Sequence, residues 1–118
     1  MKNNHFSYIE LQSTNIGETK KFYSAAFNWV FTDYGPDYAS FSNSGVDGGF
    51  AKVNSLTGSG TLLVLYHQDL GLIRKQIIDH GGKIVKDIFA FPGGKRFHFT
   101  DPSGNELAVW SEWQKTEV

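Results

Sequence analysis

The stretch that decides the fold runs from Gly93 to Trp110 and reads GGKRFHFTDPSGNELAVW. Its centre, Asp-Pro-Ser-Gly at residues 101–104, predicts a tight turn, because proline presets φ and glycine accepts the left-handed conformation. On both sides of this turn, apolar and polar side chains alternate, which is typical of half-buried β-strands. The sequence therefore predicts two adjacent strands that share one apolar face and one polar face.

The polar face of these two strands carries residue types that are common in binding and catalytic sites. Alternation assigns to it the following residues: Arg96, His98 and Thr100 before the turn, and Glu106, Ala108 and Trp110 after it. An imidazole beside a guanidinium and a carboxylate can act as an acid or base. The same residues could instead form a hydrogen-bonded network that only fixes the sheet. Both readings of His98 stay open at this point.

Composition limits the classes of protein that this chain can represent. A length of 118 residues fits a single domain with a modest core, and ten Phe, five Tyr and three Trp predict a well-filled interior. The net charge of −1, with scattered Lys and Arg, favours neither nucleic acid nor an anionic membrane as partner. The absence of cysteine excludes disulfides and thiolate chemistry. Because the N-terminus has no long apolar run, we expect a cytoplasmic protein.

The same order of elements is predicted twice along the chain. In each module a strand precedes a helix capped by Asn15 or Asp69, and three further strands follow. The predicted ranges are 6–11, 16–27, 29–32, 38–42 and 49–53, then 61–66, 70–80, 83–89, 95–100 and 106–111. Within one domain, 1–118, module one covers about 5–53, a linker about 54–60, and module two about 61–112. We therefore predict an α+β fold of two tandem βαβββ modules.

Three motifs in the order of this repeat resemble the vicinal oxygen chelate superfamily (glyoxalase/bleomycin resistance/dioxygenase-like). They are Lys-Phe-Tyr at 21–23 with Phe-Asn-Trp at 27–29, His-Gly-Gly-Lys at 80–83, and Asp-Pro-Ser-Gly-Asn at 101–105. The likeness covers essentially the whole chain and suggests a short, bacterial-type glyoxalase-related protein. It implies a curved mixed sheet around a concave pocket, helices outside, and a homodimer.

The resemblance also implies where a metal would bind. Metal-using members take His, Glu or Gln ligands from the first and last strands of each module, at positions that fall here on Tyr8, Gly49 or Phe50, Leu62 or Leu63, and Ala108. None of these is an ordinary ligand of a divalent ion. His5 lies at an odd offset from Tyr8 and faces the other way unless a bulge intervenes. We predict no cofactor, and a divalent metal is disfavoured.

We predict that the chain binds a small organic molecule in an aromatic-rich, metal-free pocket. The predicted ligand-binding residues are Tyr8, Phe50, Tyr66, Arg96 and Trp110. The alternative is a lyase or isomerase related to glyoxalase I, with His98 and Glu10 or Glu106 as acid and base, or with a metal held in an unforeseen register involving His5. A third hypothesis is a domain that acts through a protein partner or as a dimeric scaffold.

Overall fold

The computed structural model describes residues 3, 8–58 and 61–113. The chain divides into two compact units, Met1–Thr57 (unit one) and Gly58–Val118 (unit two). Each unit has the element order βαβββ and a four-stranded mixed sheet of its own. The predicted α+β fold of two tandem βαβββ modules is therefore confirmed.

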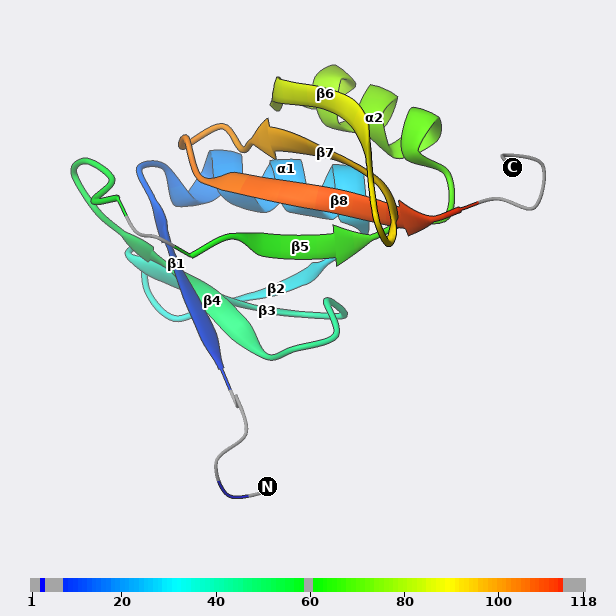
Figure 1. Ribbon diagram of the computed structural model, residues 1–118. Helices are drawn as coiled ribbons and strands as arrows, with labels where there is room; N and C mark the ends of the chain where they lie inside the picture. The colour runs from blue at the N-terminus through cyan, green and yellow to red at the C-terminus, as the bar shows by residue number, and fades with distance from the viewer. Residues whose placement is uncertain (1–2, 4–7, 59–60, 114–118) are drawn as a thin grey trace. The chain divides into compact units, whose positions relative to one another are not determined.

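Unit one contains one helix and four strands. Its elements are β1 (Ile9–Ser13), α1 (Ile16–Phe27), β2 (Val30–Asp33), β3 (Tyr38–Ser42) and β4 (Gly48–Lys52). The strand order is β1-β4-β3-β2, with β1 parallel to β4 and the other pairs antiparallel, so the first strand pairs with the last (Figure 1). Strand β1 begins at Ile9 rather than at the predicted Phe6, which lies outside the described residues.

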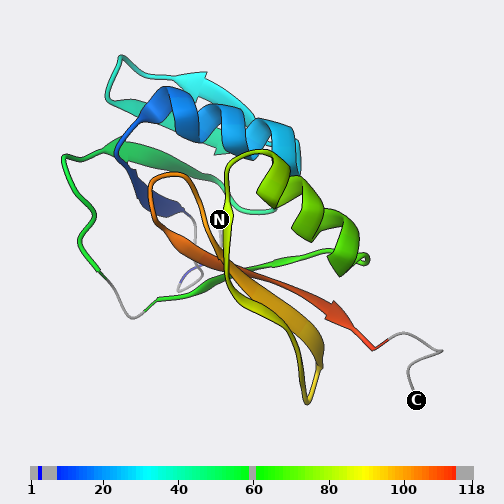
Figure 2. The same cartoon turned by 90° about the horizontal axis from the view of Figure 1, so that it is seen from above.

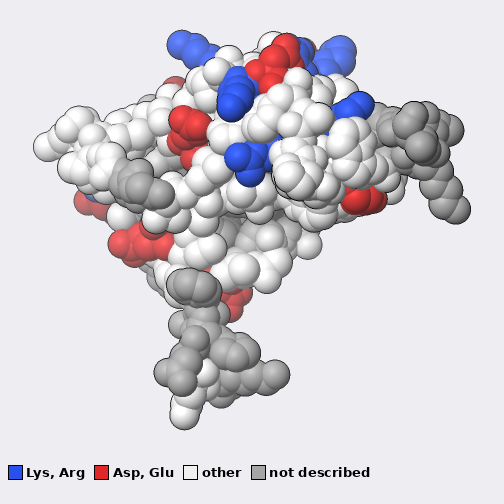
Figure 3. Space-filling model, in the orientation of Figure 1, with Lys and Arg blue, Asp and Glu red and all other residues white. Residues whose placement is uncertain are grey.

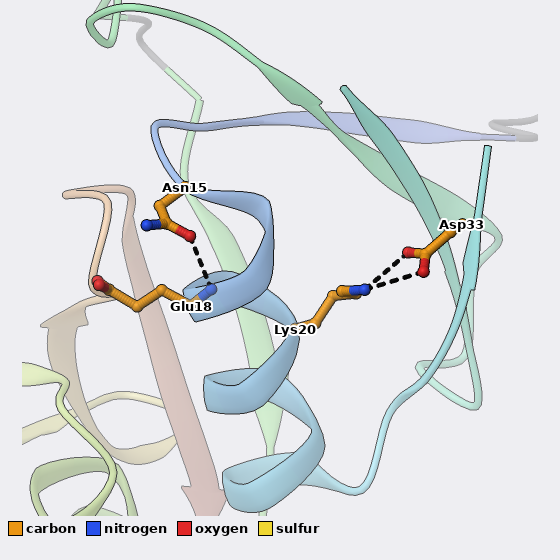
Figure 4. Close-up of polar contacts among 4 residues, drawn as sticks. All are labelled: Asn15, Glu18, Lys20 and Asp33. Atoms are coloured by element: carbon orange, nitrogen blue, oxygen red, sulfur yellow. Dashed lines mark hydrogen bonds and ion pairs between the residues drawn. The ribbon is translucent and has the colours of Figure 1, made fainter. Parts of the chain in front are cut away.

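Helix α1 is fixed at both ends by local hydrogen bonds. The Asn15 side chain accepts the backbone N–H of Glu18 at 3.0 Å, as the predicted N-cap requires. The helix ends at Asn28, which adopts a left-handed φ of 62°. Along the helix, Lys20 Nζ pairs with Asp33 of β2 at 2.8 Å (Figure 4). Because both side chains are partly exposed, this pair stabilises the unit by no more than about 1 kcal/mol.

The core of unit one is largely aromatic and lies between α1 and the sheet, an arrangement that Figure 2 shows from above. Tyr23 of α1 stacks on Trp29 with ring centres 4.6 Å apart and contacts Phe50 of β4 at 5.1 Å. Phe41 of β3 stacks on Trp29 at 4.6 Å and tilts against Phe50 at 5.6 Å. These four side chains are all buried. Aromatic packing therefore holds the helix on the sheet.

Unit two repeats the arrangement. Its elements are β5 (Leu63–Tyr66), α2 (Leu70–Asp79), β6 (Lys83–Phe91), β7 (Gly94–Thr100) and β8 (Glu106–Glu112). The order across the sheet is β5-β8-β7-β6, and β5 runs parallel to β8. The β6–β7 hairpin extends beyond the predicted strand ends at Phe89 and Lys95. Its pairing shifts in register between Lys86 and Phe89, as at a β-bulge.

The apolar face of the unit-two sheet packs beneath α2. The predicted inward residues of the helix, Leu70, Ile73 and Ile77, are buried. On the sheet, Phe97, Phe99, Leu107 and Val109 are at most 1% exposed, which confirms the alternation expected from the sequence.

Charged residues make up 19% of the chain. On the face in view, Figure 3 shows the basic side chains mainly in the upper part, with acidic ones among them and below them. Within the described ranges, no helix has the length and apolar character needed to cross a bilayer.

Candidate functional site

The strongest candidate site is one face of the unit-two sheet, which we call the polar face and define by Tyr66, Arg96, His98, Glu106 and Trp110. Backbone pairing sets Arg96 opposite Trp110, His98 opposite Ala108, and Thr100 opposite Glu106. Tyr66 of β5 lies opposite Trp110 on its other side. Strand geometry thus brings these predicted site residues together on adjacent strands.

His98 is the most enclosed polar side chain of this face. It is 9% exposed, and its Nδ1 lies 2.9 Å from Oε2 of Glu106, whose side chain is half exposed. A carboxylate only accepts hydrogen bonds, so a neutral imidazole donates its Nδ1–H to Glu106 and leaves a lone pair on Nε2. That Nε2 is buried, and none of the described residues gives it a hydrogen bond. The ring is therefore oriented on one side and unsatisfied on the other.

Arg96 is a cation held by aromatic faces. Its guanidinium carbon lies 5.3 Å from the ring centre of Phe89 and 5.4 Å from that of Phe91, both on β6. These are cation–π distances. The buried Nε has no hydrogen-bond partner in the described part of the chain. The guanidinium is thus positioned without an anionic partner there.

Aromatic rings line the rest of the polar face. Trp110 meets the ring of Tyr66 edge-on at 5.3 Å and that of Phe91 at 6.4 Å. The Tyr66 hydroxyl donates a 2.7 Å hydrogen bond to Oε1 of Glu112. This bond raises the pKa of Tyr66 and lowers the pKa of the Glu112 carboxyl.

Replacing Tyr66 with phenylalanine should raise the pKa of Glu112 toward its ordinary range, because the bond that favours the carboxylate is lost. A carboxyl whose folded pKa is lowered contributes stability above its unfolded pKa and loses it as the pH falls. The wild type should therefore lose more stability than the variant on acidification. A carboxyl ¹³C NMR titration measures the midpoint directly, and identical midpoints in the two proteins would contradict the assignment.

Two predicted residues of unit one, Tyr8 and Glu10, lie beside Tyr38. Tyr8 and Tyr38 share a short hydroxyl–hydroxyl bond. Burial raises the pKa of Tyr38, and its hydrogen bonds with Tyr8 and Glu10 add to the rise. Gly49 of β4 makes room for the pair, since a Cβ there would lie 2.4 Å from the Tyr38 hydroxyl. Glu10 thus has a tyrosine neighbour within its own unit.

Within unit one, Phe50 does not lie on the side of the sheet that carries Tyr8 and Glu10. It is 0% exposed and packs against Tyr23 and Phe41 in the core of unit one. Its neighbour Gly49 pairs with Glu10, whereas Phe50 pairs with Leu11, so Phe50 points to the opposite side of the sheet. We correct its assignment from ligand contact to core residue.

Sequence reasoning missed several residues at these clusters: Tyr38, Phe89, Phe91 and Glu112. The spacing of Phe89 and Phe91 by two residues, just before a Pro-Gly turn, is a hairpin signal that could have placed both beside Arg96. Glu112 continues the alternation of Glu106, Ala108 and Trp110 and needed only a longer strand.

A hollow of about 650 Å³ lies elsewhere in unit two, at the start of α2. It is lined by Gln68, Asp69, Leu70, Gly71, Ile88, Lys95, Ser111 and Glu112. Apart from Glu112, it contains none of the residues that make up or adjoin the polar face. It is wide open, and its polar groups carry both signs of charge, so it indicates no particular ligand.

The resemblance implies four metal-ligand positions, on or beside the paired first and last strands of each unit: Tyr8, Gly49 or Phe50, Leu62 or Leu63, and Ala108. Next to these positions, Glu10 lies opposite Gly49, which has no side chain, and Val64 lies opposite Ala108. Neither pair offers two ligating side chains. Within residues 8–58 and 61–113, no three His, Asp or Glu side chains gather as a metal cage. His5 lies outside the described residues.

Comparison with known proteins agrees with this architecture. Residues 5–109 match the model of the Glyoxalase/Bleomycin resistance protein/Dioxygenase superfamily. The chain belongs to this superfamily. No curated protein matches the sequence. The superfamily assignment confirms the resemblance stated from the three sequence motifs.

Several solved structures share the fold of this chain at low sequence identity. A glyoxalase-related enzyme from Fulvimarina pelagi has a TM-score of 0.80 at 18% identity, covering 92% of this chain and 88% of its own. A mutant of the fosfomycin resistance protein FosX from Listeria monocytogenes, complexed with Mn(II) and a dihydroxypropylphosphonic acid, reaches 0.80 at 16% identity, covering 94% and 92%. TnmS3, an antibiotic binding protein from Streptomyces, reaches 0.70 at 18%, covering 95% and 98%. These likenesses concern the fold alone.

Proposed function

We propose that this superfamily member binds a small organic molecule on the polar face of unit two, without a metal. The observation that carries the proposal is a pair of buried polar atoms, Arg96 Nε and His98 Nε2, to which no described residue forms a hydrogen bond, on a face that also carries Trp110 and Tyr66. Buried polar groups in folded proteins normally have partners, and a bound ligand can supply a missing one. The antibiotic-binding TnmS3 has the same fold, which supports binding as a function that this fold can serve.

The metal-free part of the proposal rests on residue identity. None of the implied ligand positions holds an ordinary metal ligand: they are Tyr8, Gly49 or Phe50, Leu62 or Leu63, and Ala108. The adjacent strand pairs add only the carboxylate of Glu10, and a Cβ at Gly49 would meet the hydroxyls of Tyr38 and Tyr8. One carboxylate does not make a divalent site. Metal analysis of the purified protein tests this directly: stoichiometric Zn²⁺, Mn²⁺, Ni²⁺ or Fe²⁺ that chelators remove would refute it.

A thermal-shift screen over diverse small molecules tests the binding function. A ligand that binds only the folded state stabilises it by RT ln(1 + [L]/Kd), so the melting temperature rises with the logarithm of the ligand concentration once this exceeds Kd. We expect hits whose shift is lost in Arg96→Ala and Trp110→Ala. Tyr34→Ala, which removes an exposed aromatic ring from a unit-one turn, is the matched control and should keep the shift. Hits that keep their shift in melting temperature in both Arg96→Ala and Trp110→Ala would refute the assignment of the site.

A second candidate function is acid–base catalysis, as in a lyase or isomerase. It is favoured by the 2.9 Å contact of His98 with Glu106, which orients the imidazole as a general base requires. Hits from the screen can be incubated in D₂O, and NMR then shows whether carbon-bound hydrogen exchanges. The His98→Gln variant should exchange this hydrogen about 100-fold or more slowly than the wild type. Absence of exchange for every hit would leave binding without turnover.

We also propose that the protein is a cytoplasmic homodimer, as the superfamily resemblance suggests. Light scattering coupled to size-exclusion chromatography tests the dimer, and fractionation of expressing cells tests the location. A monomer at all concentrations, or recovery outside the cytoplasm, would refute the respective part.

A further inference from the structure

We infer that the ligand of the polar face is an organic acid that also carries a hydrogen-bond donor and a flat apolar body. This inference rests on the proposed function and names the chemical class that the same site would select. Three observations carry it: a guanidinium without an ion-pair partner among the described residues, an imidazole nitrogen to which none of them donates a hydrogen bond, and a flanking set of aromatic rings.

Arg96 indicates that the ligand carries an acid group. Phe89 and Phe91 hold its guanidinium at 5.3 and 5.4 Å, which fixes the group but satisfies none of its N–H donors. No carboxylate of the described residues forms an ion pair with it, whereas Arg74 of the same unit pairs with Asp87 at 2.9 Å. A planar guanidinium is best satisfied by a carboxylate or another flat anion that accepts two bonds at once.

His98 indicates that the ligand carries a hydrogen-bond donor. Its Nδ1–H is used by Glu106, so in the neutral ring the buried Nε2 can only accept. A ligand O–H or N–H directed at this atom would satisfy it. Arg96 and His98 are two residues apart on one strand, about 7 Å between Cα atoms. The acid and the donor must therefore lie on one compact molecule.

The flat apolar body is assigned by the rings around these two groups. Trp110 pairs with Arg96 across the sheet and contacts Tyr66 and Phe91 at 5.3 and 6.4 Å. The Phe89 ring lies 5.9 Å from the His98 ring. Aromatic side chains at these separations favour an aromatic ligand that stacks or packs edge-on.

Three small probes of similar size separate the elements of this inference. Indole-3-acetate has the acid and an N–H donor, 1-naphthaleneacetate has the acid without the N–H, and indole-3-acetamide keeps the indole N–H but replaces the acid with a neutral amide. Titration calorimetry, at a pH where an ordinary imidazole is neutral, measures each dissociation constant. We expect indole-3-acetate to bind most tightly, naphthaleneacetate about fivefold more weakly, and the amide at least about tenfold more weakly, since bonds to charged groups are the stronger.

Two variants locate these preferences. Arg96→Gln should abolish the preference for acid over amide, and His98→Leu should abolish the preference for indole over naphthalene. Lys21→Gln, an exposed cation on α1, is the matched control and should change neither. Equal binding of acid and amide by the wild type, or no binding of either acid, would overturn the inference. If Trp110→Ala then still weakens neutral ligands from the screen, the proposed function survives and only the ligand class is wrong.

Discussion

Replacing Asp101 with alanine should lower the free energy of unfolding by about 3 kcal/mol or more. The carboxylate is 3% exposed, and its Oδ1 accepts backbone N–H bonds from Ser103, Gly104 and Asn105 at 3.0, 2.9 and 2.8 Å. Its Oδ2 accepts the Asn105 side-chain amide at 2.9 Å. Truncation leaves these donors without an acceptor in a part-buried turn. Urea unfolding, followed by circular dichroism, measures the loss.

Two further substitutions sharpen this test. Asp101→Asn keeps one acceptor oxygen without the charge and should cost distinctly less than alanine. Asp47→Ala removes an exposed aspartate and should change stability by less than about 0.5 kcal/mol. If Asp101→Ala were as mild as Asp47→Ala, the turn would not depend on the carboxylate. The motif that pointed to the superfamily would then need another explanation.

Replacing Phe50 with alanine should cost about 3–5 kcal/mol, the range for deleting a buried aromatic side chain. Phe50 contacts Tyr23 at 5.1 Å and Phe41 at 5.6 Å, and its removal leaves a cavity between helix and sheet. Thermal or urea unfolding of Phe50→Ala measures the effect, and Phe50→Leu should recover much of it by refilling the volume.

The Phe50 experiment also separates a core residue from a ligand contact. Tyr8→Phe alters the opposite side of the same sheet, where the side chain is 46% exposed, and should be much milder. A Phe50→Ala variant that unfolds like the wild type but loses binding of a screened ligand would contradict the core assignment.

The sequence predicted the faces of β7 and β8 because every position there has an informative side chain. Phe97, Phe99, Leu107 and Val109 are too apolar to face water, so alternation placed Arg96 and His98 on the other side. The N-caps of both helices could be predicted as well. The side chains of Asn15 and Asp69 each accept a hydrogen bond from the backbone N–H of the third residue after them.

Prediction failed where glycine hides the alternation. In β4, Gly48 and Gly49 have no side chains to reveal a face, and Phe50 was placed by its motif position instead of by pairing. The contact between Arg96 and the rings of Phe89 and Phe91 depends on the extent and register of the β6–β7 hairpin. A β-bulge shifts that register, and no local sequence pattern predicts the bulge.

The parallel pairing of β1 with β4, and of β5 with β8, has a consequence for how the chain acquires its structure. Each sheet joins strands from the two ends of its unit. The entropic cost of closing a long loop must therefore be met before the strand pairing can stabilise the sheet. Such non-local contacts slow folding compared with hairpins, which form early. The antiparallel hairpins, such as β6–β7 and β7–β8, are therefore expected to form before the parallel pairs in each unit. On the polar face, Arg96 would then lie opposite Trp110 early, and Tyr66 would join them only when β5 pairs with β8.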